Sequence, residues 1–332
     1  MLRPTSLKEI PHYPVTASVS VAAIAVTIMW WTGQNVDAFF MDGQVWAKWE
    51  LWRALSSTLP HVNFFHLAFN LYWFWIFGTL MERVFGHFRF AGLIVLLALG
   101  SMLAEFALSS GGVGLSGVGY GLWGMLWVLE KRDARFHDAV DEQTSRMFIG
   151  WFVLCIVLTV INVMPVANIA HGVGAVMGAL LGLAISGKGS VKQTSRAGLA
   201  ALLVFILAGA TIFWPYINLS GHAEPEVERA ALDALDQGKI TPAVKLLTTA
   251  TTMRHAPARA WYNLGIAYEK AGKFAEASTA FTHASQMPDS DSEMDQAAQN
   301  VKKLLNQSDS FRFPGQAAET NNLPPTDTGT NK

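Results

Sequence analysis

Long runs of apolar residues occupy the first two thirds of the chain. A helix that crosses a membrane needs about 20 mostly apolar residues, and seven windows approach or reach that length. Together they hold one acidic residue, Glu105, and no Lys or Arg. A soluble core helix rarely stays free of charge for so long, so the pattern predicts an all-α fold with a polytopic seven-helix membrane bundle over residues 15–219. The windows are residues 15–33, 62–81, 91–109, 115–129, 147–165, 167–186 and 197–219.

Basic residues between the windows predict how the bundle is oriented. Eleven Lys and Arg residues fall on the side of the N-terminus, whereas the other side carries two, Lys48 and Arg53 in the first loop. Cytoplasmic loops carry the excess of Lys and Arg, so residues 1–14 are expected in the cytoplasm. Seven crossings then place the chain after Leu219 outside. The expected location is a bacterial inner (plasma) membrane with an extracytoplasmic C-terminal domain.

The composition changes near Leu219. Charged side chains number 24 in the stretch 1–219 and 25 in the much shorter stretch 220–332, so a soluble domain follows the membrane part. Residues 260–288 resemble the helix–turn–helix tetratricopeptide pattern, with a weaker copy one repeat length, about 34 residues, earlier. We expect helical repeats over residues 220–307 and a disordered tail over 308–332. A plain helical hairpin is the alternative. The pattern positions are Trp261, Leu264, Gly265, Tyr268, Gly272, Ala277, Phe281, Ala284 and Pro288, and, in the weaker copy, Gly238, Ala243, Leu247 and Ala250.

Bulk charge and cysteine content exclude several classes of function. The net charge of −1 gives no electrostatic basis for a nucleic-acid partner. A single cysteine, Cys155, excludes an internal disulfide and a Cys-rich metal site. The expected partner of the apolar windows is the lipid bilayer. The repeats are candidates for binding a protein or peptide, or else only stabilise the fold.

Polar residues inside the windows are the candidates for function, because they cost free energy in lipid. His66 and Asn70 lie one helical turn apart in HLAFN, Ser116 lies in GLSG, and His171 lies in AHGVGAVMG. Each alone has an ordinary interpretation, as a helix-packing, pore or transporter residue. In the predicted topology, however, all of them lie in the first turns of helices that run inward. They are therefore expected at one depth, just below the outer surface.

Glycines provide a way to bring two of these helices into contact. Gly117, Gly121 and Gly124 fall on nearly one face of their helix, and Gly174 and Gly178 do the same on theirs. Such contact would bring the His171 imidazole within reach of the Ser116 hydroxyl, as a nucleophile with its base.

An oxyanion formed beside such a serine needs hydrogen-bond donors. The available donors are His66, the Asn70 amide and the backbone N–H groups of Leu115 and Ser116. An acidic third member is not obvious, so we expect a dyad. The helix that starts at Ser116 is short, which would leave a gap above it for water.

These motifs together resemble the rhomboid intramembrane serine proteases over roughly residues 45–186. The resemblance implies a six-helix core, here with a seventh helix appended. It also implies cleavage of single-pass membrane proteins in or near their transmembrane segment, without a metal or a cofactor. It implies that Ser116 is the nucleophile, that His171 is the base, and that the oxyanion is held around His66 and Asn70. The further matching positions are Trp52–Arg53 in the first loop, Glu82–Arg83, Gly114 and Gly117 around the serine, Tyr120 packed on the histidine, and Gly174 and Gly178.

Some alternatives stay open at this stage. An inactive relative that binds or escorts membrane proteins would share the fold, although such relatives typically lose the serine or alter its motif. Glu105 either faces headgroups and water or lines the cavity near Ser116. Trp151 and Phe152 either face lipid or form part of a lateral gate.

Overall fold

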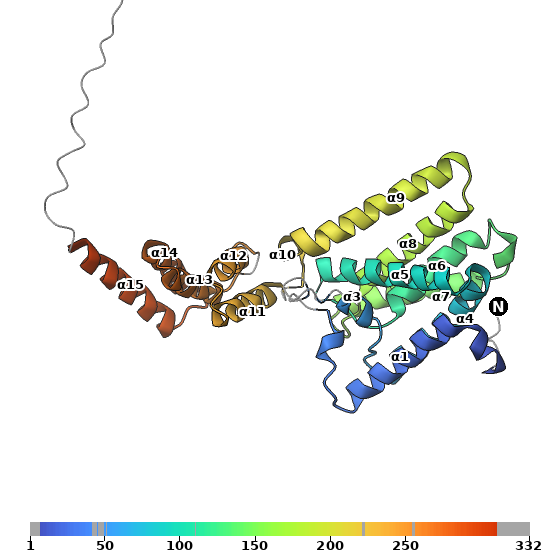
Figure 1. Cartoon of the computed structure of the whole chain (residues 1–332), viewed down its shortest axis with the longest axis horizontal. Coiled ribbons are helices and arrows are strands. Elements are labelled where there is room, and N and C mark those ends of the chain that lie inside the picture. The colour runs from blue at the N-terminus through green and yellow to red at the C-terminus, as the bar shows by residue number, and fades with distance from the viewer. Residues whose placement is uncertain are drawn as a thin grey trace, which may run out of the picture. The chain divides into compact units, whose positions relative to one another are not determined.

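The computed structural model describes residues 7–41, 45, 50, 52–109, 111–220, 223–253 and 256–310, which form helices joined by loops (Figure 1). The chain divides into two compact units, Met1–Ala230 and Ala231–Lys332. The predicted all-α polytopic fold is confirmed for this chain.

All seven apolar windows are helices. Six of these helices are long and apolar enough to cross a membrane. The seventh, α6, has 14 residues and is therefore only about 21 Å long. The elements of this unit are η1 (Leu7–His12), α1 (Pro14–Trp31), η2 (Asp37–Phe39), α3 (Arg53–Ser56), α4 (Phe64–Phe85), α5 (His87–Leu108), α6 (Ser116–Leu129), η3 (Ala134–Phe136), α7 (Glu142–Val160), α8 (Asn168–Ser186), α9 (Gly189–Ala208), η4 (Gly209–Phe213) and α10 (Trp214–Ile217).

Glu82 explains how a carboxylate is tolerated inside α4. Its side chain is buried and accepts hydrogen bonds from the backbone N–H groups of Val15 and Thr16, each at 2.9 Å, and from the Thr16 hydroxyl at 2.7 Å. The first N–H groups of a helix have no partner within it. Glu82 thus caps α1 from another helix and joins the two helices at one end of the bundle.

The centre of the bundle is the contact between α6 and α8, where backbone meets backbone. A Cβ added at Gly178 would overlap the carbonyl oxygen of Gly121 and lie 2.7 Å from its carbonyl carbon. A Cβ added at Gly174 or Gly124 would likewise overlap a carbonyl oxygen of the facing helix. The expected close approach of these helices therefore holds, and only glycine fits at these positions.

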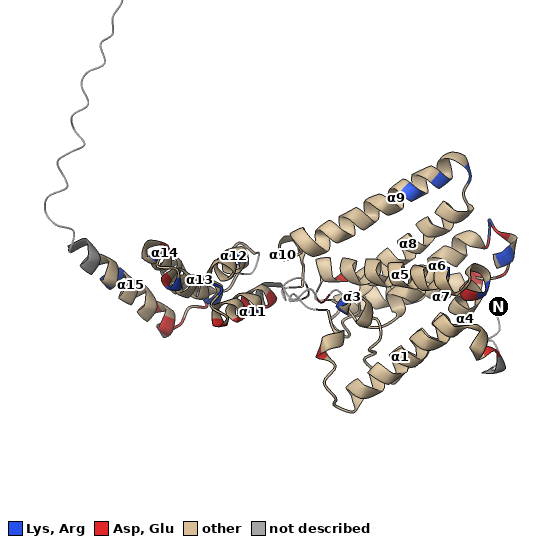
Figure 2. Cartoon of the chain, in the orientation of Figure 1, with Lys and Arg blue, Asp and Glu red and all other residues tan. Residues whose placement is uncertain are grey.

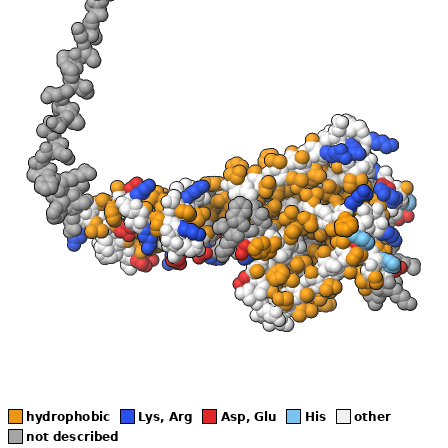
Figure 3. Space-filling model, in the orientation of Figure 1, with side chains coloured by type: hydrophobic (Ala, Val, Ile, Leu, Met, Phe, Trp, Pro, Cys, Tyr) orange, Lys and Arg blue, Asp and Glu red, His pale blue; other side chains and the backbone are white. Residues whose placement is uncertain are grey.

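Charge and hydrophobicity are separated along the bundle. Figure 2 shows the Lys and Arg residues of this unit gathered mainly at the end where α6 leads to α7 and α8 leads to α9. Hydrophobic side chains cover the flank of the bundle in Figure 3. Val204 and Phe205 on α9, for example, are largely exposed. A lipid environment accounts for such a surface, and the unit is a multi-pass membrane bundle.

The second unit consists of short amphipathic helices around small cores. The turns before α12 and α14 both contain a glycine with positive φ, Gly238 at 71° and Gly272 at 73°. The starts of these two helices, Ile240 and Phe274, are one tetratricopeptide repeat length apart, about 34 residues. Gly265 lets α13 approach the ring of Phe281 on α14. The helices assigned to the expected repeat region are α11 (Ala223–Asp236), α12 (Ile240–Thr251), α13 (Ala258–Lys270), α14 (Phe274–Ser285) and α15 (Ser292–Ser310). The expected disordered tail overlaps the last residues of α15, and its remainder, residues 311–332, lies outside the described residues.

Candidate active site

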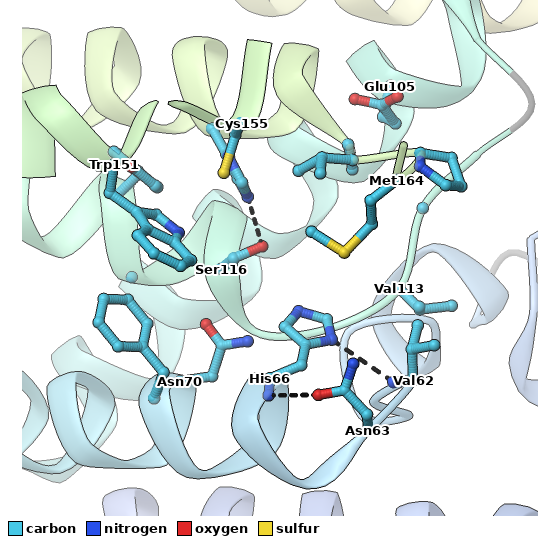
Figure 4. A pocket seen from close by; sticks show the side chains of 18 of the residues that line it. Val62, Asn63, His66, Asn70, Glu105, Val113, Ser116, Trp151, Cys155 and Met164 are labelled. Atoms are coloured by element: carbon cyan, nitrogen blue, oxygen red, sulfur yellow. Dashed lines mark hydrogen bonds between the residues drawn. The ribbon is translucent and has the colours of Figure 1, made fainter. Parts of the chain in front are cut away.

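A cavity of about 1070 Å³ opens between α4, α6, α7 and α8 (Figure 4). Most of its wall is apolar. Its polar lining includes Ser116, His171, His66 and Asn70, which are the four residues singled out in the sequence. They come from three helices and meet in one cavity, as the common depth required.

The serine sits where a loop turns into α6. Gly114 has φ +103°, a conformation that favours glycine, and its N–H donates to the carbonyl of Ser57 at 3.1 Å. Ser116 is the first residue of α6, so its own N–H has no partner within the helix. Gly117 packs against Ser101, whose Oγ would lie 2.7 Å from an added Cβ. The serine is therefore held by close contacts on both sides.

His171 reaches the serine from the first turn of α8. Its Nε2 lies 2.7 Å from Ser116 Oγ, and the residue is 4% exposed. The ring stacks on Tyr120, with centroids 4.7 Å apart and planes at 24°. The Tyr120 hydroxyl in turn donates to the carbonyl of Phe148 at 2.9 Å. The other ring nitrogen, Nδ1, is buried and has no hydrogen-bond partner among the described residues, so the geometry is that of a pair.

His66 and Asn70 follow from the way α4 begins. Asn63 caps this helix, because its side-chain oxygen accepts the N–H of His66 at 2.9 Å. His66 Nδ1 accepts the N–H of Val62 at 3.4 Å, which leaves the proton on Nε2, and this nitrogen lies next to Gly114. One turn later the Asn70 side-chain NH₂ is buried without a partner among the described residues. Two N–H donors are thus available beside the serine.

His61 belongs to the same site, although no pattern in the sequence pointed to it. It is fully buried, its Nδ1 lies 2.8 Å from the carbonyl of Leu59, and its Nε2 accepts the N–H of Leu115 at 3.3 Å. Its ring packs edge-on against His66 at 4.8 Å. Burial lowers the pKa of His61 to about 3, so the ring is neutral at ordinary pH. His61 precedes the predicted helix, and helical spacing does not predict the position of a loop residue.

Comparison with known proteins identifies the family. The sequence model of the Rhomboid domain matches residues 48–188. The chain is 31% identical over 182 residues to Rhomboid protease GlpG of Pectobacterium atrosepticum. The aligned region covers 51% of this chain and 61% of that protein. It is 31% identical over 134 residues to Rhomboid protease GlpG of Haemophilus influenzae. This aligned region covers 40% of this chain and 69% of that protein. The chain belongs to the rhomboid family.

The rhomboid match contains α4 to α8 and the whole candidate site, close to the range 45–186 expected from the motifs. α1 precedes it, and α9 and the second unit follow it. The chain spans less than two thirds of the length of the Pectobacterium relative.

Leu115 was expected to donate its N–H to an oxyanion. In the structure this N–H donates to His61 Nε2, so it could help an oxyanion only by leaving that partner. The N–H of Ser116, which has no partner within α6, remains as a backbone donor for an oxyanion.

Two other expected positions of the rhomboid domain lie away from the cavity. Trp52 is 54% exposed, whereas Arg53 is buried and organises the first loop. Its guanidinium donates to the Glu50 carboxylate and to the carbonyls of Asp37 and Phe40. Arg53 holds the loop, and neither residue lines the cavity.

The cavity wall on the α4–α7 side is aromatic. Trp151, which is 41% exposed, stacks on Phe69 with centroids 5.3 Å apart, and both line the cavity. Phe152 lies farther in, 6.4 Å from the His171 ring. Glu105 is 3% exposed and lines the cavity, so the alternative that places it at the cavity holds and the one that places it among headgroups is wrong.

Proposed function

We propose that this chain is an intramembrane serine endopeptidase that cleaves single-pass membrane proteins in or near their transmembrane segment. The observation that carries the proposal is the 2.7 Å contact between His171 Nε2 and Ser116 Oγ inside a cavity of a membrane bundle. The family membership and the protease names of the relatives support it.

The proposed reaction begins when His171 Nε2 takes the proton of the Ser116 hydroxyl as Oγ attacks the scissile carbonyl. The oxyanion is stabilised by the N–H of Ser116, the Asn70 amide and His66 Nε2–H. His171 then gives its proton to the leaving amine, and an acyl-serine remains. Water enters the cavity, loses a proton to His171 and releases the acid by the same steps.

The lining of the cavity supports the proposed substrate class. Its wall is mainly apolar, and the Phe69–Trp151 stack is exposed on the flank between α4 and α7. We infer that an unwound part of a transmembrane segment enters from the lipid on this side. The orientation inferred from Lys and Arg places the cavity mouth and the second unit on the outer side. Accessibility of cysteines introduced near each terminus would test this orientation.

The test is cleavage of a single-pass substrate by the purified full chain in proteoliposomes. Ser116→Ala and His171→Ala should each lower turnover by several orders of magnitude, and Asn70→Ala should lower it about a hundredfold. Ser186→Ala is the matched control, since this serine bonds back to its own helix at Gly182. A fluorophosphonate probe should label wild type and the control but not Ser116→Ala. Equal cleavage by wild type and Ser116→Ala would refute the assignment. Failure of wild type to label or cleave would favour the alternative of a membrane-protein binder or escort.

The second unit is proposed to be a tetratricopeptide-like array that recruits a substrate ectodomain or a partner. The repeat is supported by the starts of α12 and α14, which are separated by one repeat length, about 34 residues. Removing residues 220–332 should slow cleavage of a full-length client and leave cleavage of a minimal transmembrane peptide unchanged. If the two substrates respond alike, the unit acts as a stabilising appendage.

A further inference from the structure

The N-terminus of α8, the helix that carries His171, has no capping side chain of its own. Its N-cap residue is Ala167, which makes no side-chain cap hydrogen bond. Asn168, the next residue, is turned away, because its side-chain NH₂ donates to Thr159 at 2.8 Å. The first four N–H groups of a helix need partners from outside it, and in a membrane an unpaired one is costly.

Glu105 provides the missing cap from α5. Its Oε2 accepts the N–H of Ala170 at 2.9 Å across 65 residues of sequence. The residue is 3% exposed. The capped peptide group belongs to the residue directly before His171, so Glu105 fixes the backbone from which the imidazole projects.

Glu105 also contacts the loop that leads to the serine. A Cβ added at Gly112 would lie 3.4 Å from Glu105 Cγ and 2.7 Å from Ala167 Cβ. The loop before Ser116 and the start of α8 are thus packed against the same carboxylate-bearing side chain. The loop before Ser116 and the start of α8 must be aligned for the 2.7 Å contact between Ser116 and His171, and both adjoin Glu105.

The His171 ring needs such an anchor because nothing described holds its Nδ1. In a serine–histidine–aspartate triad, an acid on this nitrogen keeps the imidazole oriented. Here the ring is oriented by stacking on Tyr120 and by the backbone of α8. We propose that Glu105 is a positioning residue, which aligns His171 through the hydrogen bond to Ala170 instead of through the ring itself.

The inference rests on the proposed protease function and is tested in wild-type protein that labels and cleaves. Glu105→Gln keeps an oxygen that can accept the Ala170 N–H, whereas Glu105→Leu has a similar size and no acceptor. We expect Glu105→Leu to lower kcat by about tenfold to a hundredfold, as a misplacement of the order of 1 Å does, with KM within about twofold of wild type. Glu105→Gln should keep kcat within about threefold. Turnover is expressed per fluorophosphonate-labelled site, so that loss of folded protein does not lower it.

Glu82 offers a matched control, because it also caps a helix from a neighbouring one but the helix it caps, α1, carries none of the dyad. Glu82→Leu should lower the unfolding temperature and leave kcat per labelled site unchanged. The proposal is overturned if Glu105→Leu keeps wild-type kcat, if Glu105→Gln loses as much as Glu105→Leu, or if Glu82→Leu loses as much. Should Glu105→Leu not fold, Glu105→Ala takes its place under the same criteria. Absence of cleavage and labelling in wild type would instead refute the proposed function.

Discussion

Gly178→Ala tests whether the dyad depends on backbone contact between α6 and α8. The added methyl carbon would overlap the carbonyl oxygen of Gly121 and lie 2.7 Å from its carbonyl carbon and 2.9 Å from the nitrogen of Met125. All three are backbone atoms of a buried helix, so no side chain can turn aside. Since carbon contacts are favourable near 3.5–4.0 Å, α8 would have to move by roughly 1 Å.

The displacement should act on the dyad two turns away. His171 lies seven residues before Gly178, about 10 Å along α8. A separation larger by about 1 Å stretches the 2.7 Å contact with Ser116 beyond hydrogen-bond range. We expect turnover to fall about a hundredfold and the unfolding free energy to fall by about 1–3 kcal/mol.

The assay compares cleavage in proteoliposomes, fluorophosphonate labelling and thermal unfolding for Gly178→Ala and a control. Gly198→Ala is the control, because its Cβ on α9 would meet only Leu180, at 3.7 Å. It should behave as wild type or unfold slightly later, since alanine favours a helix over glycine. Wild-type cleavage and unfolding in Gly178→Ala would refute the backbone-contact argument.

Two further predictions concern residues that brace the site. His61→Leu leaves the buried N–H of Leu115 without its acceptor, which should cost about 1–3 kcal/mol of stability and slow cleavage, whereas the exposed His137→Leu should change neither. Burial lowers the pKa of His61 to about 3 from about 6.5 in an unfolded chain, so the unfolded state binds the proton more tightly. Wild type should therefore lose stability as the pH falls from 6.5 toward 3. In thermal unfolding, His61→Leu should lose less stability over that range. Asn218→Ala removes the hydrogen bonds to the carbonyls of Phe106 and Ser109. The variant should be less stable by about 1 kcal/mol and should be cut faster after α10 in limited proteolysis. Unchanged melting and proteolysis would contradict this role of Asn218.

The sequence predicts the helices and the contact between Ser116 and His171 well, because both depend on regular spacing. Charge-free apolar windows long enough to cross a bilayer are a strong signal, and the positions of Ser116 and His171 within their windows place them at one depth. The glycine faces of α6 and α8 then imply the close approach. Each of these inferences uses helical periodicity, which a sequence displays directly.

The parts that could not be predicted rest on contacts between distant segments or in loops. Glu105 caps α8 from 65 residues away, and no local pattern connects the two. His61 lies in a loop, so its contact with Leu115 depends on a path that periodicity does not specify. Trp52 and Arg53 were assigned to the first loop by motif alone, and the hydrogen bonds of Arg53 show how it organises that loop.

The glycine contact between α6 and α8 separates a rigid part of the bundle from a part where side chains meet. Ser116 and His171 sit on the helix pair whose backbones touch, whereas the proposed entrance between α4 and α7 is lined by a stack of side chains, Phe69 on Trp151. Side chains can rotate at little cost, but touching backbones cannot separate without unpacking the core. The side chains at the proposed entrance can therefore rearrange or be substituted, while Ser116 and His171 keep their alignment. Under the proposed function, the bundle can accept different substrates at its entrance and leave its reactive pair unaltered.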